Sequence, residues 1–245
     1  MVNLLIDIGN TAMKVACFRD KALLKAGRAA WADNDEVEEL LLKMLSFGPS
    51  RAFLGNVSKK KETIESILQA ASVPYTYFLP ETPVPIKNRY ETPETLGRDR
   101  LANAVAANQI YPGLPVVVID AGTCIKFDFV TGKNEYFGGS IAPGIDMRFA
   151  ALHKFTARIP LIERSETVYL IGKNTREAVQ SGVINGALAE VKGILEQYQM
   201  THKDLKVIIT GGDHALLERS LKTSVLSDPW LTLKGLNEIL HYHAG

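Results

Sequence analysis

One short pattern occurs twice in the chain, and this duplication limits the fold more than any other feature. Near the start, an apolar run reaches Asp7 and a Gly9–Thr11 turn, and a second β-favouring run follows. The same order returns at Asp120, with a Gly122–Thr123 turn and another extended run. Each copy predicts a strand, a tight turn and a strand. A hairpin that merely needs to turn has no reason to keep a strand-end Asp, a Gly and a Thr in both places.

The segments around the two copies have helical spacing. Apolar stripes with a period near 3.6 predict helices over 35–47, 59–71, 99–109 and 175–199, and a short one over 214–221. Asn174 and Glu177 form a capping box at the start of the longest of them. Strands that alternate with helices indicate an α/β fold. We expect two duplicated halves, 1–114 and 115–245, with a cleft between them.

The bulk composition excludes several kinds of protein. The chain has 245 residues, 46% of them hydrophobic, and a net charge of +1, which argues against broad electrostatic binding to nucleic acid or membrane. No apolar run approaches the ~20 residues that span a bilayer. Cys17 and Cys124 are interpreted as reduced, buried side chains, so a cytoplasmic location is expected.

The first turn carries groups that suit a phosphate. Gly9 lets the backbone approach a ligand closely, and the amides after it can donate to phosphate oxygens together with the Thr11 hydroxyl. Lys14 supplies a cation, and Asp7 can hold Mg²⁺ through its carboxylate, often with water between them. For this copy alone, an ordinary hairpin remains the alternative. A P-loop is excluded because its Gly-x-x-x-x-Gly-Lys-Ser/Thr pattern is absent.

The second copy favours phosphate binding. Two such loops facing each other can clamp a polyphosphate and its metal from both sides, and phosphoryl transfer needs mainly positioning and charge neutralisation. The duplicated loop resembles that of the superfamily of acetate and sugar kinases, Hsp70 and actin, which implies ribonuclease-H-like halves. The ATP-binding residues that we expect are Asp7, Ile8, Gly9, Asn10, Thr11, Ala12, Met13, Lys14, Gly122 and Thr123.

A narrower resemblance lies between the two copies. The segment Tyr90–Arg100 resembles the Tyr-x-x-Pro-x-x-Leu-Gly-x-Asp-Arg segment of type III pantothenate kinases. The stretch Gly138–Gly144 and the pair Asn174–Thr175 match the same family in the same order. The resemblance implies an ATP-dependent phosphorylation of pantothenate to 4′-phosphopantothenate, the first step of coenzyme A biosynthesis.

The resemblance also implies roles for single residues. Asp99 would be the general base that accepts the proton of the attacking hydroxyl. The pantothenate contacts would be Tyr90, Gly97, Arg98, Asp99, Arg100 and Thr175. In the family, Thr175 reaches pantothenate from the partner subunit, which implies a homodimer with a composite site. From the residues alone, Asp99 could instead form a salt bridge or cap a helix, and Thr175 could be an N-cap.

Asp120 resembles the ligand of a monovalent cation, K⁺ or NH₄⁺, on which the family depends. Two residues depart from the family's second loop: Cys124 replaces an Ala and Lys126 replaces a Thr. Lys126 adds a charge near the phosphates or points away to solvent. The turn Thr210–Gly212 resembles the loop on the nucleoside side of the superfamily. Gly182 and Gly186 lie one turn apart and could lie in the dimer interface.

Two other functions remain as alternatives. Some close relatives of the family are known as transcriptional accessory factors, which would not need Asp99. Another small-molecule kinase of the superfamily is the second alternative, and the Tyr90–Arg100 segment speaks against it.

Overall fold

The computed structural model describes residues 1–55, 61–221 and 224–243. The chain divides into two compact units. The first unit comprises residues 1–113, 130–138 and 230–245, and the second comprises 114–129 and 139–229. The C-terminal stretch thus belongs to the same unit as the N-terminus, a division different from the halves 1–114 and 115–245.

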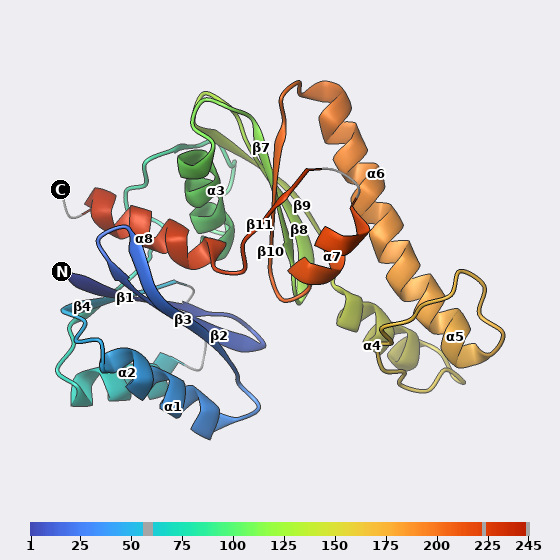
Figure 1. Cartoon of the computed structure of the whole chain (residues 1–245), viewed down its shortest axis with the longest axis horizontal. Helices are drawn as coiled ribbons and strands as arrows, with labels where there is room; N and C mark the ends of the chain where they lie inside the picture. The colour runs from blue at the N-terminus through green and yellow to red at the C-terminus, as the bar shows by residue number, and fades with distance from the viewer. Residues whose placement is uncertain (56–60, 222–223, 244–245) are drawn as a thin grey trace. The chain divides into compact units, whose positions relative to one another are not determined.

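The first unit is built on a five-stranded sheet (Figure 1). In spatial order the strands are β3 (Ala22–Ala30), β2 (Ala12–Arg19), β1 (Val2–Ile8), β4 (Arg51–Leu54) and β5 (Tyr75–Tyr77). β1, β2 and β3 form an antiparallel meander, whereas β4 and β5 continue the sheet in parallel. The short strand β6 (Lys87–Asn88) pairs in parallel with Glu135 and Tyr136.

Both faces of this sheet are covered because β1 is apolar on both sides. Leu4, Ile6 and Ile8 pack against α1 (Asn34–Leu45) and α2 (Lys61–Ala70). Leu5, on the opposite face, packs in a second core with α3 (Arg98–Ile110) and α8 (Leu231–His243). Successive side chains of a strand point to opposite faces, so a continuous apolar run gives two cores.

The helices α3 and α8 approach each other closely at Gly235. A Cβ at this glycine would lie 1.9 Å from the Ala102 carbonyl oxygen, so only a residue without a side chain fits there. Two buried polar contacts secure the packing of α8. Thr232 Oγ1 donates to Asn103 Oδ1 at 2.9 Å, and Asn3 Nδ2 donates to Asn237 Oδ1 at 3.3 Å.

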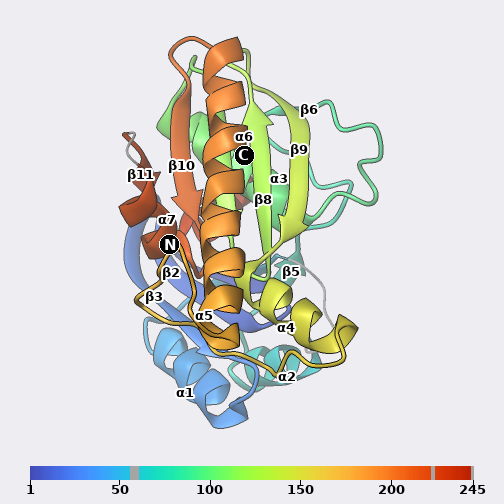
Figure 2. The same cartoon turned by 90° about the vertical axis from the view of Figure 1, so that its right-hand side faces the viewer.

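The second unit has its own sheet with one helical cover (Figure 2). The strands of this sheet follow the order β11 (Leu226–Ser227), β10 (Lys206–Thr210), β7 (Val116–Ala121), β8 (Cys124–Val130), β9 (Glu135–Pro143) and β6. β6 and the first residues of β9 belong to the first unit. The helices are α4 (Ile145–Phe155), α5 (Thr175–Gln180), α6 (Gly186–Thr201) and α7 (His214–Ser220). Side chains of β7, β8, β10 and these helices share one apolar core.

The longest predicted helix forms, but a π-helical turn, η1 (Ser181–Asn185), separates α5 from α6. The turn anchors the preceding loop. Ser181 Oγ donates to the Leu170 carbonyl at 2.8 Å, and Asn185 Nδ2 donates to the Tyr169 carbonyl at 3.3 Å. Such single π turns are frequent at functional sites.

The other predicted elements have mixed outcomes. The two hairpins and the helices expected over 35–47, 99–109 and 214–221 are confirmed within a few residues. The helix expected over 59–71 begins at Lys61 among the described residues, and its expected start at 59–60 lies outside them. Cys17 is buried as expected, but Cys124 is only half-buried, so that part of the interpretation is wrong. In the described part of the chain, no helix is long and apolar enough to cross a membrane.

Candidate active site

The first predicted phosphate loop is the turn of the β1–β2 hairpin. Asp7 pairs with Lys14, and Ile8 pairs with Met13, so the turn comprises Gly9 to Thr11. Residues directly opposite each other in an antiparallel pair have Cβ atoms ~4.5–5.5 Å apart on the same face. The register therefore places the Asp7 and Lys14 side chains on the same face of the hairpin as direct cross-strand neighbours. Asp7 is 7% exposed, so this carboxylate is largely withdrawn from water.

Trp31 fixes the direction of the turn. Its indole Nε1 donates to the Gly9 carbonyl at 2.7 Å, and its backbone amide donates to the Thr11 carbonyl at 3.1 Å. A trans peptide directs its N–H opposite its carbonyl, so the Asn10 amide points away from Trp31. A Cβ on Gly9 would lie 2.9 Å from the Ala12 carbonyl oxygen, which explains the glycine.

Gly55, at the end of β4, is a contributor that the sequence reasoning missed. Its amide donates to the Ile6 carbonyl at 2.7 Å. A Cβ there would lie 3.4 Å from Asp7 Oδ1 and 3.2 Å from Leu236 Cδ1. Gly55 therefore keeps space beside the Asp7 carboxylate. The position of Gly55 directly after a buried parallel strand is the sequence signal that could have identified it.

Asp99 lies in the first turn of α3. Gly97 is the N-cap residue, and a Cβ there would be 2.5 Å from Asp99 Oδ1, so the carboxylate turns back over the helix start. The partial positive charge of a helix N-terminus stabilises a carboxylate there. Asp99 is half-buried, which leaves it accessible to a small substrate.

Arg98, next to it, is buried and points into its own loop. Its Nη2 donates to the carbonyls of Pro93 at 2.6 Å and of Leu96 at 2.7 Å, and its Nε donates to Leu96 as well. The guanidinium also lies over the Phe78 ring, 5.7 Å from its centroid. Burial lowers the pKa of Arg98 from its usual value, although Glu81 and Asp99 oppose this. These contacts fix the shape of the 93–97 loop.

Arg100 and Tyr90 form a joint surface in the same unit. The Arg100 guanidinium carbon lies 5.6 Å from the centroid of the Tyr90 ring, and Arg100 is 4% exposed. Tyr90 stacks on Tyr136 with ring centroids 6.3 Å apart. Gly138, at φ +91°, leaves room for Tyr90, because a Cβ there would lie 2.7 Å from the ring. Part of the Gly138–Gly144 match thus supports Tyr90.

The second predicted phosphate loop belongs to the second unit and is packed among glycines. The Gly122 amide donates to the Cys124 carbonyl at 2.9 Å, and the Gly144 amide donates to the Thr123 carbonyl at 3.1 Å. Gly144 is the N-cap residue of α4, and a Cβ there would lie 2.2 Å from the Gly122 carbonyl oxygen. The loop thus contacts the N-terminus of an 11-residue helix, which favours anions.

Asp120, at the end of β7, is engaged by Lys126 of the neighbouring strand β8. Lys126 Nζ lies 2.7 Å from Asp120 Oδ2, and the two side chains are 17% and 13% exposed. On the other side, a Cβ at Gly211 would lie 2.6 Å from Asp120 Oδ1. Gly211 has φ +93°, which favours glycine, so the turn after β10 closes over the carboxylate.

Thr175 is the first residue of α5 and is exposed. The cap is Asn174, whose Oδ1 accepts from the Glu177 amide at 3.0 Å, while Glu177 Oε2 accepts from the Lys173 amide at 2.8 Å. The predicted cap by Asn174 is thus confirmed, while Glu177 accepts from the Lys173 amide rather than from that of Asn174, and Thr175 is not needed as the cap.

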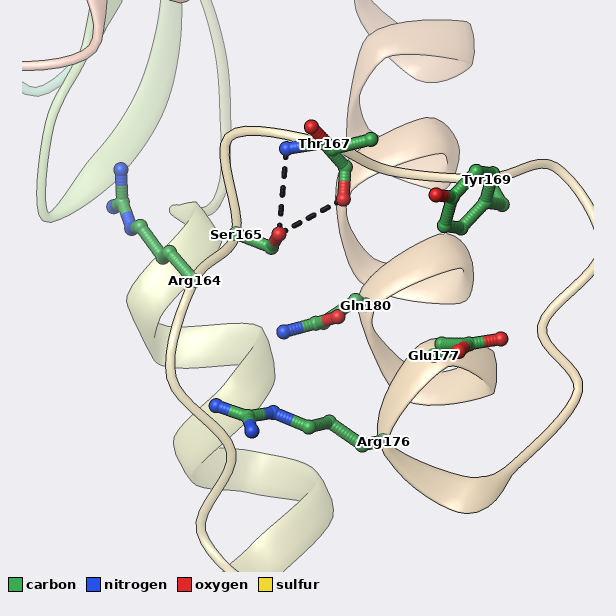
Figure 3. Close-up of a pocket in the computed structure, with 7 residues that line it drawn as sticks. All are labelled: Arg164, Ser165, Thr167, Tyr169, Arg176, Glu177 and Gln180. Carbon is green, nitrogen blue, oxygen red and sulfur yellow. Dashed lines mark hydrogen bonds between the residues drawn. The ribbon is translucent and has the colours of Figure 1, made fainter.

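A polar pocket of about 420 Å³ lies beside the start of this helix (Figure 3). Burial alone would lower the pKa of Arg164, one of its lining residues, but ion pairs with Asp213 and Asp146 raise it above its usual value. The pocket is lined by Arg164, Ser165, Thr167, Tyr169, Arg176, Glu177 and Gln180.

The predicted site residues therefore fall into two groups. The first unit brings Asp7–Lys14 and Tyr90–Arg100 into one compact body, and the second unit holds Asp120–Thr123 and Thr175. Among the described residues, no three His, Cys, Asp or Glu side chains gather as a metal cage. A single carboxylate such as Asp7 still suits Mg²⁺, because this ion keeps several waters and binds substrate phosphates.

Comparison with known proteins places the chain among characterised sequences. The profile of the type III pantothenate kinase family matches residues 3–197. A type III pantothenate kinase of Christiangramia forsetii is 40% identical over 244 residues, which cover 99% of each chain. That of Bacteroides fragilis is 38% identical over 100% of this chain and 99% of its own. A Campylobacter jejuni structure named for the Baf family of transcriptional activators has a TM-score of 0.60 at 22% identity, with 98% of both chains covered.

Proposed function

Because the chain belongs to the type III pantothenate kinase family, we propose that its two phosphate loops and the Tyr90–Arg100 segment act together in one active site. The chain is a kinase that transfers the γ-phosphoryl group of ATP to pantothenate. The product is 4′-phosphopantothenate, and the family implies the coenzyme A pathway. Similarity over the full length to curated relatives is the observation that carries this function.

Asp99 is the proposed general base. A primary alcohol is a poor nucleophile at neutral pH, and a carboxylate within hydrogen-bond reach can accept its proton during attack. The fold over Gly97 and the α3 N-terminus favour the ionised form of Asp99, which is the form that accepts. Tyr90, Gly97 and Arg100 are the proposed pantothenate contacts. The bonds of Arg98 to loop carbonyls favour a positioning role for it.

The Asp7–Lys14 turn and the Gly122–Thr123 turn are the proposed ATP phosphate contacts. The Asn10 amide and the α4 N-terminus offer backbone donors, and Lys14 offers a cation beside Asp7. Asp7 would hold Mg²⁺, which neutralises phosphate charge when bound. The turn Thr210–Gly212 is the proposed contact to the nucleoside of ATP. The β1–β2 and β7–β8 hairpins, each with a strand-end Asp, support two ribonuclease-H-like halves around a cleft.

A monovalent cation at Asp120 fits the structure poorly. The carboxylate that would bind K⁺ or NH₄⁺ already forms an ion pair with Lys126. A second cation placed against the same group would be repelled by the ammonium, and repulsion is strong where water is excluded. No part of the proposed mechanism therefore requires K⁺.

A homodimer remains part of the proposal. The exposed apolar run Tyr169–Ile171 is 61–80% exposed, and it precedes the exposed Thr175 in the same unit. A Cβ at Gly182 or Gly186 would meet no atom within 4 Å, so their helix face is open to a neighbour. We keep a cytoplasmic location as a proposal as well, since the two cysteines are free.

The function is tested by ADP release coupled to a spectroscopic readout, with pantothenate and a panel of polyols as acceptors. Pantothenate should support turnover and the polyols should not. Turnover on a polyol alone would favour another small-molecule kinase. No release with any acceptor would favour the transcriptional accessory role, although the likeness to the Campylobacter jejuni structure shows the fold alone.

A further inference from the structure

The ion pair between Lys126 and Asp120 is the feature that the reaction described above does not yet use. It joins two adjacent strands of the second unit, β7 and β8, with Nζ and Oδ2 2.7 Å apart. Both side chains are more than four-fifths buried, at 17% and 13% exposed. A pair withdrawn from water to this degree is held in one geometry, unlike most surface pairs.

Two groups flank the Asp120 carboxylate, one at each of its oxygens. Its Oδ2 accepts the Lys126 ammonium, and its Oδ1 lies against the backbone of Gly211. The glycine is required there, because its φ is +93° and because a Cβ at this position would lie 2.6 Å from Oδ1. The Lys126 ammonium is thus the cation that forms an ion pair with the Asp120 carboxylate.

The pair also lies directly beside a phosphate loop. Asp120 is separated from Gly122 by one residue, and Lys126 is two residues beyond Cys124, whose carbonyl accepts from the Gly122 amide. The same loop contacts the N-terminus of α4 through Gly144. A fixed positive charge at this place adds to the backbone donors that attract phosphate oxygens.

We infer that the Lys126 ammonium is a tethered monovalent cation, which supplies covalently the single positive charge that a dissolved K⁺ would supply at Asp120. A lysine ammonium is a compact point charge like a small cation. Lys126 is then a positioning residue for the second phosphate loop. The inference rests on the proposed function, and it means that the wild-type kinase turns over without K⁺ or NH₄⁺.

The first test uses the wild-type chain. Pantothenate-dependent ADP release is measured in choline, Na⁺, K⁺ and NH₄⁺ chlorides at equal ionic strength, with Mg²⁺ constant. Equal rates in all four salts are expected. A strong requirement for K⁺ or NH₄⁺ in the wild type would overturn the inference and leave the kinase function standing. Absence of turnover in every salt would instead contradict the proposed kinase function.

The second test replaces Lys126 with threonine, the residue that the family has at this position of the loop (Lys126→Thr). This variant should lose about tenfold or more of its rate in Na⁺ or choline and regain it in K⁺ or NH₄⁺. Lys133→Thr, which removes an exposed lysine, should respond to no salt. A folded Lys126→Thr protein that is equally impaired in all salts would show that the pair is only structural.

The third test measures K⁺ binding through thermal unfolding. It needs no activity, and it also shows whether each variant is folded. A ligand that binds the folded state raises the thermal midpoint as its concentration increases. K⁺ should therefore raise the midpoint of Lys126→Thr more than Na⁺ does, and the wild type should show no such difference. The double variant Asp120→Asn/Lys126→Thr lacks both charges and should lose the K⁺ response. A K⁺ response that persists in the double variant would place the ion elsewhere and contradict the inference.

Discussion

Asp99 shows how much one side chain depends on the backbone around it. The carboxylate folds over Gly97, where a larger residue would push it away from the helix start. Its neighbours in sequence have different tasks: Arg98 bonds to the loop carbonyls, and Arg100 lies over Tyr90. The pattern Gly-Arg-Asp-Arg thus combines a helix N-cap, a loop anchor, the proposed base and a proposed substrate contact within one helical turn.

Asp99→Asn should lower kcat by about 10²–10⁴-fold, because the amide keeps the shape but cannot accept the proton. The KM for pantothenate should change much less than kcat, since the lost interaction belongs to the transition state. ATP binding, measured by calorimetry, should survive. An Asn variant with nearly wild-type kcat and a much raised KM would make Asp99 a binding residue only.

The two cysteines should differ in reactivity. Burial raises the pKa of the Cys17 thiol from 9.0 to about 11, so at pH 8 it is protonated and enclosed. Half-buried Cys124 follows Thr123 in the second phosphate loop. Iodoacetamide should therefore modify Cys124 first, and Mg²⁺–ATP should slow the reaction. Mass spectrometry of the wild type and of Cys124→Ala checks both points, and an unchanged rate with ATP would argue against the phosphate contact.

The raised pKa of the buried Cys17 thiol also makes the stability of the protein depend on pH. A thiol whose pKa is higher in the folded state ionises first in the unfolded state. Cys17 therefore contributes its full share of stability below pH 9 and loses it as the pH rises toward 11.

Among the elements, the helices were predictable where their stripes were regular, and the missed elements have physical reasons. The final helix α8 was missed although Leu236, Ile239 and Leu240 follow a helical period, because it buries residues on most of its surface. The π turn could not be seen either, since it arises from the bonds of Ser181 and Asn185 to a loop. Lys126 left two orientations open in the sequence, and the position of Asp120 decided between them.

The close contact between α3 and α8 predicts that a Gly→Ala substitution in α8 destabilises the protein, although such a substitution in a helix normally stabilises it. Alanine normally stabilises a helix interior by about 0.5–1 kcal/mol relative to glycine. Gly193→Ala in α6, where a Cβ meets nothing within 4 Å, should show this gain in urea unfolding. Gly235→Ala should instead destabilise by about 1–3 kcal/mol, because its Cβ meets the Ala102 backbone. Two equal gains would mean that α8 is not packed closely on α3.

At the scale of the whole molecule, the α/β class and the two hairpins were readable from the repeated loop. The compact units combine distant segments, since residues 230–245 and 130–138 belong to the first unit, and the division into halves 1–114 and 115–245 stays a prediction. Contacts so far apart in sequence leave no local pattern. The candidate site residues divide between the two units.

A mixed dimer tests the composite site. If Thr175 reaches the pocket of the neighbouring subunit, an inactive Asp99→Asn protein and an inactive Thr175→Glu protein should complement each other after subunit exchange. One site of each mixed dimer then carries both defects and the other none. At equal mixing, half of the dimers are mixed, so roughly a quarter of the wild-type rate should return. No recovery after exchange verified by native mass spectrometry would confine Thr175 to its own subunit.

The late position of α8 has a consequence for how the protein is made. Thr232 of α8 bonds to Asn103 of α3 across 129 positions, and Leu236 lies beside Gly55 and the Asp7 strand. A ribosome therefore releases β1 and α3 long before α8, the helix that packs on them, has been synthesised. Until then the apolar face that includes Leu5 and Val105 stays open to chaperones. Assembly of the first unit is thus deferred until α8 has been synthesised.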